Sequence, residues 1–212
     1  SFCGVFALKP SFGGINRGGS FDTISQSSTS TFAATLEETW QIARAITSRV
    51  GGDPGYPGVS GPMDAPAPQT PRRVALLHTE GWERTVDDAK QALKDVRARL
   101  ESAGIEVVEG RRDDRVAKVE DAITGGVELS GGLNNWDFRW PLNTYARDMD
   151  RNGLSQQALD RLVAAESMTH EEYQVLVRKR QGVRDIYNAL KGDVEVCVTL
   201  SAPGPAPVGL GW

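Results

Sequence analysis

Apolar residues recur at steps of three and four between positions 85 and 104, the spacing of one face of an α-helix. They are Val86, Ala89, Leu93, Val96 and Leu100. Thr85 and Asp88 suit the start of this helix, and Gly104 suits its end. Short apolar runs flank it at Arg73–His78 and Ile105–Val108. The pattern predicts a βαβ unit, in which two parallel strands are joined by a right-handed crossover.

A second helix is predicted from Leu36, because Thr35 and Glu38 have the spacing of a capping box. In this motif the Thr hydroxyl accepts a hydrogen bond from a backbone N–H of the first helical turn that has no partner within the helix. The Glu carboxylate accepts one from the backbone N–H of the Thr. The pair Gly51-Gly52 is expected to end the helix.

Two more helices are expected late in the chain. Ser155 caps one that runs to about Ser167, and a capping box from Thr169 to Glu172 opens another that Gly192 ends. The β-branched residues from Val194 to Leu200 then predict a buried strand.

The remaining segments are rich in Gly, Ser and Pro. Residues 1–30 suit strand fragments and tight loops, 53–71 suit a surface loop or linker, and 201–211 break into a Pro/Gly run. Strands and helices otherwise alternate, so the fold class is α/β. We expect one partial domain over 1–212, divided into 1–52, a linker at 53–72, and a later α/β part at 73–212.

Composition narrows the possible partners. A formal net charge of −4 gives no basic excess for nucleic acid, and no apolar run reaches the roughly 18 to 20 residues that span a bilayer. We therefore expect neither a nucleic-acid partner nor a membrane. Cys3 and Cys197 lie far apart in sequence, which favours a reducing compartment and makes the cytoplasm the expected location.

Residue types that carry catalysis are sparse. His78 and His170 stand without a nearby nucleophile motif, and the two Cys and two His lack the paired spacing of a zinc site. We expect no metal and no cofactor. The segment from Gly13 to Ser20 lacks the Lys-Ser/Thr pair of a phosphate-binding loop, so turn glycines are the better interpretation. Solvated surface is the favoured interpretation of the acidic pairs Asp113-Asp114, Glu120-Asp121 and Glu171-Glu172.

The densest aromatic patch contains Trp136, Phe138, Trp140 and Tyr145, after an expected loop at 130–132. Such a patch beside a glycine loop can line a pocket for an apolar substrate group. A helix packed into the core is the alternative, and it is the more common one. Trp136, Phe138 and Trp140 are the candidate substrate-binding residues.

The opening run Ser1-Phe2-Cys3-Gly4-Val5-Phe6-Ala7-Leu8-Lys9-Pro10-Ser11-Phe12-Gly13 resembles the segment that closes the amidase signature. In that family a Cys-Gly precedes two or three apolar residues and a Lys-Pro-Thr/Ser run with a glycine. A second match follows at Ala34-Thr35-Leu36-Glu37-Glu38, which is similar to the family's Arg-Thr-Val-Glu-Asp helix start. Softer matches continue to the proline-rich run at 202–207, so the resemblance spans essentially the whole chain.

The resemblance implies a mixed β-sheet covered by α-helices, and a centre of a nucleophilic Ser, a second Ser in a cis peptide and a Lys. In the family these residues precede the Cys-Gly segment. The resemblance therefore places the centre upstream of Ser1, gives no catalytic role to Ser1 or Lys9, and implies a family domain that continues beyond both ends. One departure is the run Ser25 to Thr31, where the family has a Ser-Leu-Asp-x-Val/Ile-Gly-Pro-like stretch.

Three hypotheses follow. The first is amide hydrolysis of a small-molecule substrate by a parent amidase, with this chain inactive alone. The second is a non-catalytic amidase-like module that binds a partner or self-associates, for example as a homo-oligomer. The third is a nucleotide-binding βαβ protein.

Overall fold

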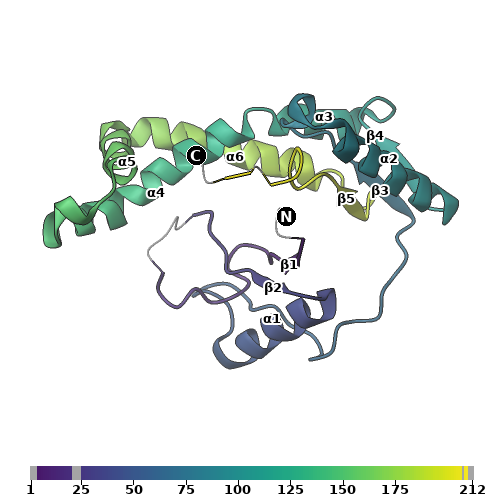
Figure 1. The fold of residues 1–212 in the computed structure, drawn as a ribbon, viewed down its shortest axis with the longest axis horizontal. Coiled ribbons are helices and arrows are strands. Elements are labelled where there is room, and N and C mark those ends of the chain that lie inside the picture. The colour runs from purple at the N-terminus through teal and green to yellow at the C-terminus, as the bar shows by residue number, and fades with distance from the viewer. Residues whose placement is uncertain (1–3, 21–24, 207, 210–212) are drawn as a thin grey trace. The chain divides into compact units, whose positions relative to one another are not determined.

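The structure is a computed structural model that describes residues 4–20, 25–206 and 208–209. The chain forms two compact units. One contains Pro68–Val127 and Arg178–Trp212 together with Ser1–Gly4, and the other contains Val5–Ala67 and Glu128–Val177. Two of the boundaries between the units fall inside long helices, Gly126–Asp148 and His170–Asn188 (Figure 1).

A three-stranded parallel sheet is the centre of the first unit. Its strands are β3 (Arg73–Leu76), β4 (Glu106–Glu109) and β5 (Val196–Val198), in the order β4-β3-β5. Helix α2 (Asp87–Ser102) joins β3 to β4, which pair in parallel from Arg73–Glu106 to Leu76–Glu109. The predicted βαβ unit is confirmed.

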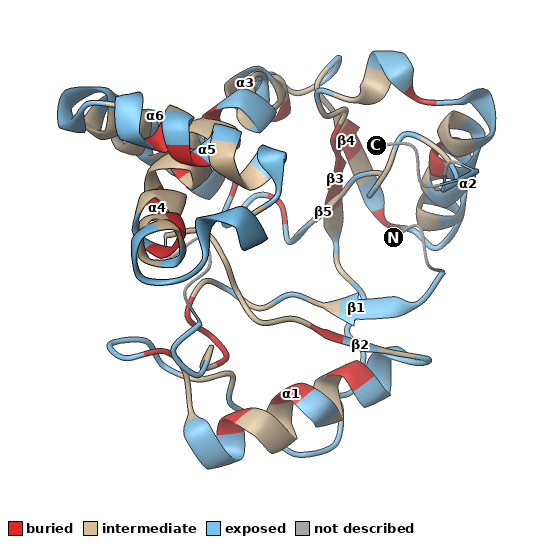
Figure 2. Cartoon of the chain, turned by 60° about the vertical axis from the view of Figure 1, so that its left-hand side comes forward, coloured by how far each residue is buried: buried red, intermediate tan, exposed pale blue. Residues whose placement is uncertain are grey.

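Both faces of this sheet are covered, because alternate residues of a strand point to opposite sides. Val74 and Leu76 pack with Leu93 of α2, whereas Ala75 and Leu77 pack with Val116 and Val119 of α3 (Asp114–Ile123). Within this sheet the buried residues are concentrated on β3, as Figure 2 shows, and Val108 is the buried residue of β4. The core of this unit is therefore a helix–sheet–helix sandwich.

Two sequence predictions for this unit need correction, and one element was missed. Helix α2 begins after Val86 without a side-chain cap, because the Thr85 hydroxyl donates to the carbonyl of Gly81 instead of capping the helix. The strand β5 is not fully buried: among the described strands it pairs only with β3, and Val196 is 42% exposed. A short 3-10 helix at Trp82–Arg84, which the sequence did not predict, precedes α2.

The second unit has a two-stranded antiparallel sheet, β1 (Phe6–Leu8) with β2 (Thr31–Ala33), and helix α1 (Leu36–Val50). The predicted start of α1 is confirmed, since Thr35 and Glu38 form both hydrogen bonds of the capping box. Gly51 at the C-cap has φ +68°, a left-handed value that favours glycine. Buried Thr39, Ala43 and Thr47 mark the packed side of α1.

The other helices of the chain are α4 (Gly126–Asp148), α5 (Gln156–Ser167) and α6 (His170–Asn188), with a short 3-10 helix at Arg151–Gly153. Ser155 caps α5 by accepting from the N–H of Ala158, as predicted. Thr169 and Glu172 form the predicted capping box of α6. Helix α6 ends at Asn188, four residues before Gly192. No helix in the described ranges is both long and apolar enough to cross a bilayer.

Helix α3 was not predicted. A helix was the more common alternative for the aromatic patch from Trp136 to Tyr145, and it is present as part of α4, whereas the expected loop at 130–132 was wrong. Those residues lie inside α4, whose glycines and Pro141 hid the helical pattern. Gly132 has a packing reason: a Cβ at this position would lie 2.7 Å from Cδ1 of Leu176. The missing side chain thus lets α4 approach α6 closely.

Candidate functional site

The described part of the opening motif, from Gly4 onward, forms β1 and the turn that follows it; Ser1–Cys3 lie outside the described residues. Gly13 has φ +74°, and a Cβ there would lie 2.4 Å from the ring of Tyr56. Its carbonyl accepts from the N–H of Asp53 at 2.9 Å. The glycines of this segment form a turn packed against the 53–59 loop.

An ion pair fixes the same turn. Asp53 accepts from the backbone N–H of Arg17 at 2.9 Å and from its Nε at 2.7 Å, with both side chains largely buried. The backbone hydrogen bond, aided by the guanidinium, lowers the pKa of Asp53 below its ordinary value. The turn after the motif is therefore held by a buried charged contact.

The run that departs from the family pattern is bound to α4. Buried Asp137 accepts from both the N–H and the hydroxyl of Ser25, at 2.9 and 2.8 Å. The amide nitrogen of Gln26 donates to Asn134 at 2.7 Å and to the carbonyl of Ser130 at 3.1 Å. Polar residues of α4 thus position the backbone from Ser25 onward, a role that helical periodicity alone does not reveal.

The three candidate substrate-binding residues lie on different sides of α4. Trp136 stacks on Tyr173 of α6, with ring centroids 4.6 Å apart and planes at 10°. The guanidinium of Arg161 lies over Phe138 at 5.5 Å. Trp136 and Phe138 are therefore half-buried side chains that contact neighbouring helices.

Trp140 lies elsewhere, on the exposed side of α4, where its side chain is 64% exposed. It lines a cavity of about 440 Å³ together with Pro141, Thr144, Tyr145 and Asp148. Trp136 and Phe138 do not line this cavity. Trp140 therefore borders an open space large enough for a small molecule.

Arg139 fastens the aromatic part of α4 to the end of α5. Its guanidinium lies 4.2 Å from the centroid of Trp136 and donates to the carbonyls of Ala165 and Met168, at 2.8 and 2.7 Å. A planar cation can stack on a ring and reach backbone oxygens at the same time. This contact holds α4 against the end of α5.

Each histidine lies beside a tryptophan of its own unit. His78 follows β3 and stacks on Trp82 at 3.8 Å, whereas His170 begins α6 at 6.0 Å from Trp136. Cys197 is unpaired in β5. Over the residues with described placement, no three His, Cys, Asp or Glu side chains gather as metal ligands.

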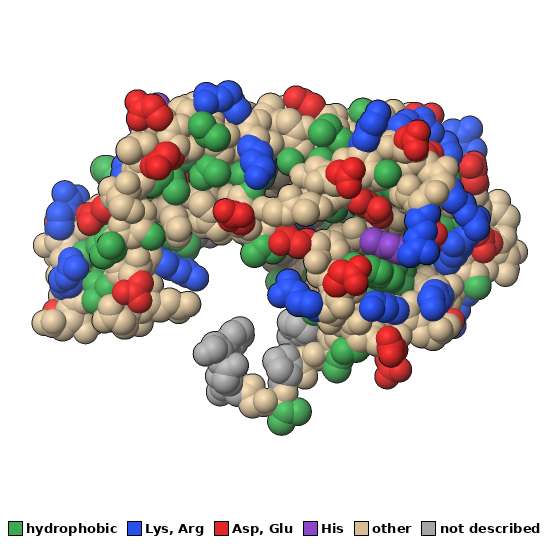
Figure 3. Space-filling view, turned by 90° about the horizontal axis from the view of Figure 1, so that it is seen from above, with side chains coloured by type: hydrophobic (Ala, Val, Ile, Leu, Met, Phe, Trp, Pro, Cys, Tyr) green, Lys and Arg blue, Asp and Glu red, His purple; other side chains and the backbone are tan. Residues whose placement is uncertain are grey.

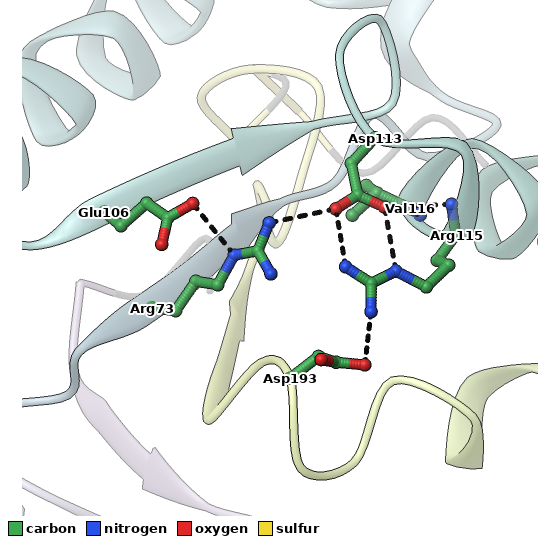
Figure 4. A network of polar contacts seen from close by, with 6 residues as sticks. All are labelled: Arg73, Glu106, Asp113, Arg115, Val116 and Asp193. Atoms are coloured by element: carbon green, nitrogen blue, oxygen red, sulfur yellow. Dashed lines mark hydrogen bonds and ion pairs between the residues drawn. The ribbon is translucent and has the colours of Figure 1, made fainter.

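Two of the acidic pairs that were assigned to solvated surface each have one member bound within the fold, and Figure 4 shows the first of them, Asp113. The Asp113 side chain is 9% exposed; it pairs with Arg73 and Arg115 at 3.1 Å each and caps α3 through the N–H groups of Arg115 and Val116. The guanidinium of Arg115 also forms an ion pair with Asp193. Glu120 is also engaged, since it accepts from the N–H of His78 at 2.7 Å. Both carboxylates organise the backbone around the parallel sheet.

The fold is that of an α/β protein. It has a βαβ unit with helices on both faces of a parallel sheet, and an opening strand that ends in a glycine turn. Both features agree with the α/β fold that the opening motif implies. The family model described as Amidase matches residues 1–207. The chain belongs to the amidase family. A search of curated proteins gave no match.

Solved structures share the fold. One described as "Crystal structure of amidase" has a TM-score of 0.75 at 18% identity, covering 99% of this chain and 43% of that one. Another, described as "An unexpected vestigial protein complex reveals the evolutionary origins of an s-triazine catabolic enzyme", has a TM-score of 0.72 at 23% identity. Its inhibitor-bound form has a TM-score of 0.73 at 22% identity. Both of these last two matches cover 100% of this chain and 45% of the solved chain. The chain therefore spans less than half the length of these structures.

Proposed function

We propose that this chain is part of a protein that hydrolyses the C–N bond of a small carboxamide. The observation that carries the proposal is the match of the amidase family model to residues 1–207. The match takes in the opening motif, the βαβ unit and the late helices together. It is therefore broader than any single local motif.

The proposed reactive residues are a nucleophilic Ser, a second Ser in a cis peptide, and a Lys, all from residues before Ser1. A neutral Lys amine draws a proton through the bridging Ser, and the nucleophilic Ser attacks the carbonyl carbon. Backbone N–H groups of a glycine loop stabilise the oxyanion that develops. The chain described in this structure then supplies support and part of the substrate pocket.

The exposure of the β1–β2 sheet supports the proposal that further residues of the amidase domain precede Ser1. Phe6 of β1 is 51% exposed, Phe32 of β2 is 61% exposed, and Val5 beside β1 is 42% exposed. A two-stranded sheet is marginal on its own, and its open edges favour pairing with further strands. We propose that strands from the preceding part of an amidase domain cover these residues.

Substrate contact by α4 belongs to the same proposal. Trp140 is the strongest candidate, because it borders the 440 Å³ cavity with Tyr145. Trp136 and Phe138 would act by holding α4 against α6 and Arg161. A cytoplasmic location is proposed as well, on the wide sequence separation of Cys3 and Cys197.

A second candidate is a non-catalytic module that self-associates. The exposed Phe6 and Phe32 favour it, since two copies could pair through the same open strands. Light scattering separates the two candidates: self-association predicts a dimer whose mass falls to that of a monomer when both Phe residues are changed to Ser. A monomer at all concentrations excludes it.

The catalytic proposal is tested by ammonia release from a panel of small carboxamides. We expect no release by the 212-residue chain and measurable release by a longer protein that adds the preceding residues. Changing the proposed upstream nucleophile to Ala should abolish the activity of the longer protein. Ammonia release by the short chain alone would overturn the assignment of the reactive centre.

A further inference from the structure

A cavity of about 210 Å³ opens at the carboxyl ends of β3 and β4, entirely within the first unit. His78 and Arg111, which follow these strands, line it beside residues of α2. Its apolar base includes Leu76 and Leu93, which are 1% and 5% exposed. Ligands of open α/β sheets bind outside the carboxyl ends of the strands. The volume holds about seven waters at roughly 30 Å³ each, enough for a compact ion.

Four cations and one carboxylate line this small space: Lys90, Lys94, Arg97 and Arg111, with Glu109. The first three lie four and then three residues apart, and so share one side of α2. Figure 3 shows Lys and Arg side chains gathered beside a histidine on this face. Like charges at such spacing repel each other. A bound anion would offset the repulsion.

Only one of these cations is neutralised by carboxylates. Arg97 binds Glu101 at 2.9 Å and Glu109 at 3.0 Å. Lys90 lies 5.7 Å over the ring of Trp82 and has no carboxylate partner among the described residues. Lys94 and Arg111 likewise form no hydrogen bond or ion pair with that part of the chain. Three positive charges therefore face the cavity uncompensated.

The aromatic side chains limit the shape of the ligand. His78 covers one face of Trp82, with planes 6° apart and centroids separated by 3.8 Å, and Lys90 lies over the ring as well. Because His78 occupies one face of the Trp82 ring, at most one face is left for a nucleobase to stack on. A compact oxyanion without a flat aromatic group fits better than a nucleotide.

We propose that this cavity binds a phosphate group, through Lys90, Lys94 and Arg111, with Trp82 and His78 as its wall. A dianion matches the excess of positive charge, and Lys and Arg are the side chains that bind phosphate. The site is independent of amide hydrolysis, because it uses none of the residues proposed for that reaction.

Calorimetric titration of the 212-residue chain with inorganic phosphate, pyrophosphate and glycerol 3-phosphate, at constant ionic strength, tests this site. We expect saturable binding of at least one of the three. The double variant K94Q/R111Q should weaken that binding at least tenfold, and the charge-conserving K94R/R111K should retain it. Tighter binding of the inorganic ions than of glycerol 3-phosphate would identify the ligand as free phosphate. The reverse preference would identify it as a phosphorylated small molecule.

The matched control is R99Q/K118Q, which removes the same charge from exposed positions of α2 and α3 that do not line the cavity. It should bind as the unmodified chain does. If K94Q/R111Q and R99Q/K118Q weakened ligand binding equally, the loss would be explained by net charge alone, and the proposed site would be wrong. Absence of saturable binding for all three ligands would also overturn it. So would tighter binding that depends on Trp82 in a parallel titration with adenosine triphosphate.

Discussion

Asp113 offers a direct test of the polar network that joins the parallel sheet to α3. Its carboxylate accepts from the N–H groups of Arg115 and Val116 at the start of the helix and pairs with the guanidinium of Arg73. The Nε of Arg73 lies 3.2 Å from Glu106 but lacks hydrogen-bond geometry. Asp113 is therefore the principal hydrogen-bond partner of a largely buried guanidinium.

Asp113→Ala should destabilise α3 by about 2 to 4 kcal/mol. Loss of the helix cap accounts for about 1 kcal/mol. Leaving the partly buried Arg73 without its partner adds about 1 to 3 kcal/mol. The pair with Arg115 adds little, because that guanidinium is 43% exposed and screened by water. Asp113→Asn keeps a capping oxygen and should lose less.

Amide hydrogen exchange of residues 114–123 is the suitable assay, since the chain has two units and global unfolding need not be two-state. The expected loss of protection is about 30- to 700-fold, at 1.4 kcal/mol per tenfold change. Asp121→Ala, an exposed change in the same helix, is the control and should stay within about 0.5 kcal/mol. Equal protection in the Asp113 and Asp121 variants would refute the reasoning.

The same network predicts a pH dependence. Hydrogen bonds from Arg115 hold the pKa of Asp113 below its ordinary value of 3.8. The unfolded chain therefore takes up the proton first as the pH falls. The stabilisation is complete above pH 3.8 and is lost as the pH drops towards the lower pKa of the folded state. The unmodified chain should lose α3 protection over this acid range, and Asp113→Ala should show little of that loss.

Three further changes have expected outcomes. Gly13→Ala should destabilise the second unit and lower its melting temperature, because the new Cβ would meet the Tyr56 ring at 2.4 Å with φ at +74°; an unchanged melting temperature would contradict the turn. Thr35→Ala should cost about 1 kcal/mol by removing a capping box, measured by urea unfolding followed by circular dichroism. Trp140→Ala should leave stability within about 0.5 kcal/mol, as expected for an exposed side chain, but raise KM in a catalytically active longer protein; an unchanged KM would remove Trp140 from the substrate site.

Much of the fold follows from local patterns in the sequence. The capping box at Thr35 fixed the start of α1 to the residue, and the periodicity before Gly104 located α2 between two parallel strands. These signals work because caps and apolar faces are determined by neighbours in sequence. The opening motif likewise led to the family that the model match confirms.

Other features depend on contacts between distant residues. Helix α4 contains Gly131, Gly132 and Pro141, which are typical of loops, and its weak periodicity is overridden by packing against Leu176. The burial of Asp113 depends on Arg73, forty residues away. The cavity residue Trp140 could be named from its aromatic patch. That it lies on another side of α4 from Trp136 and Phe138 could be recognised only once this segment was known to be a helix.

The position of the reactive serine is the central claim, and mapping a covalent label tests it most directly. A longer protein that includes the residues before Ser1 is treated with a fluorophosphonate probe, digested, and sequenced by tandem mass spectrometry. The account predicts one labelled peptide, located before Ser1. A labelled serine anywhere within residues 1–212 would contradict it.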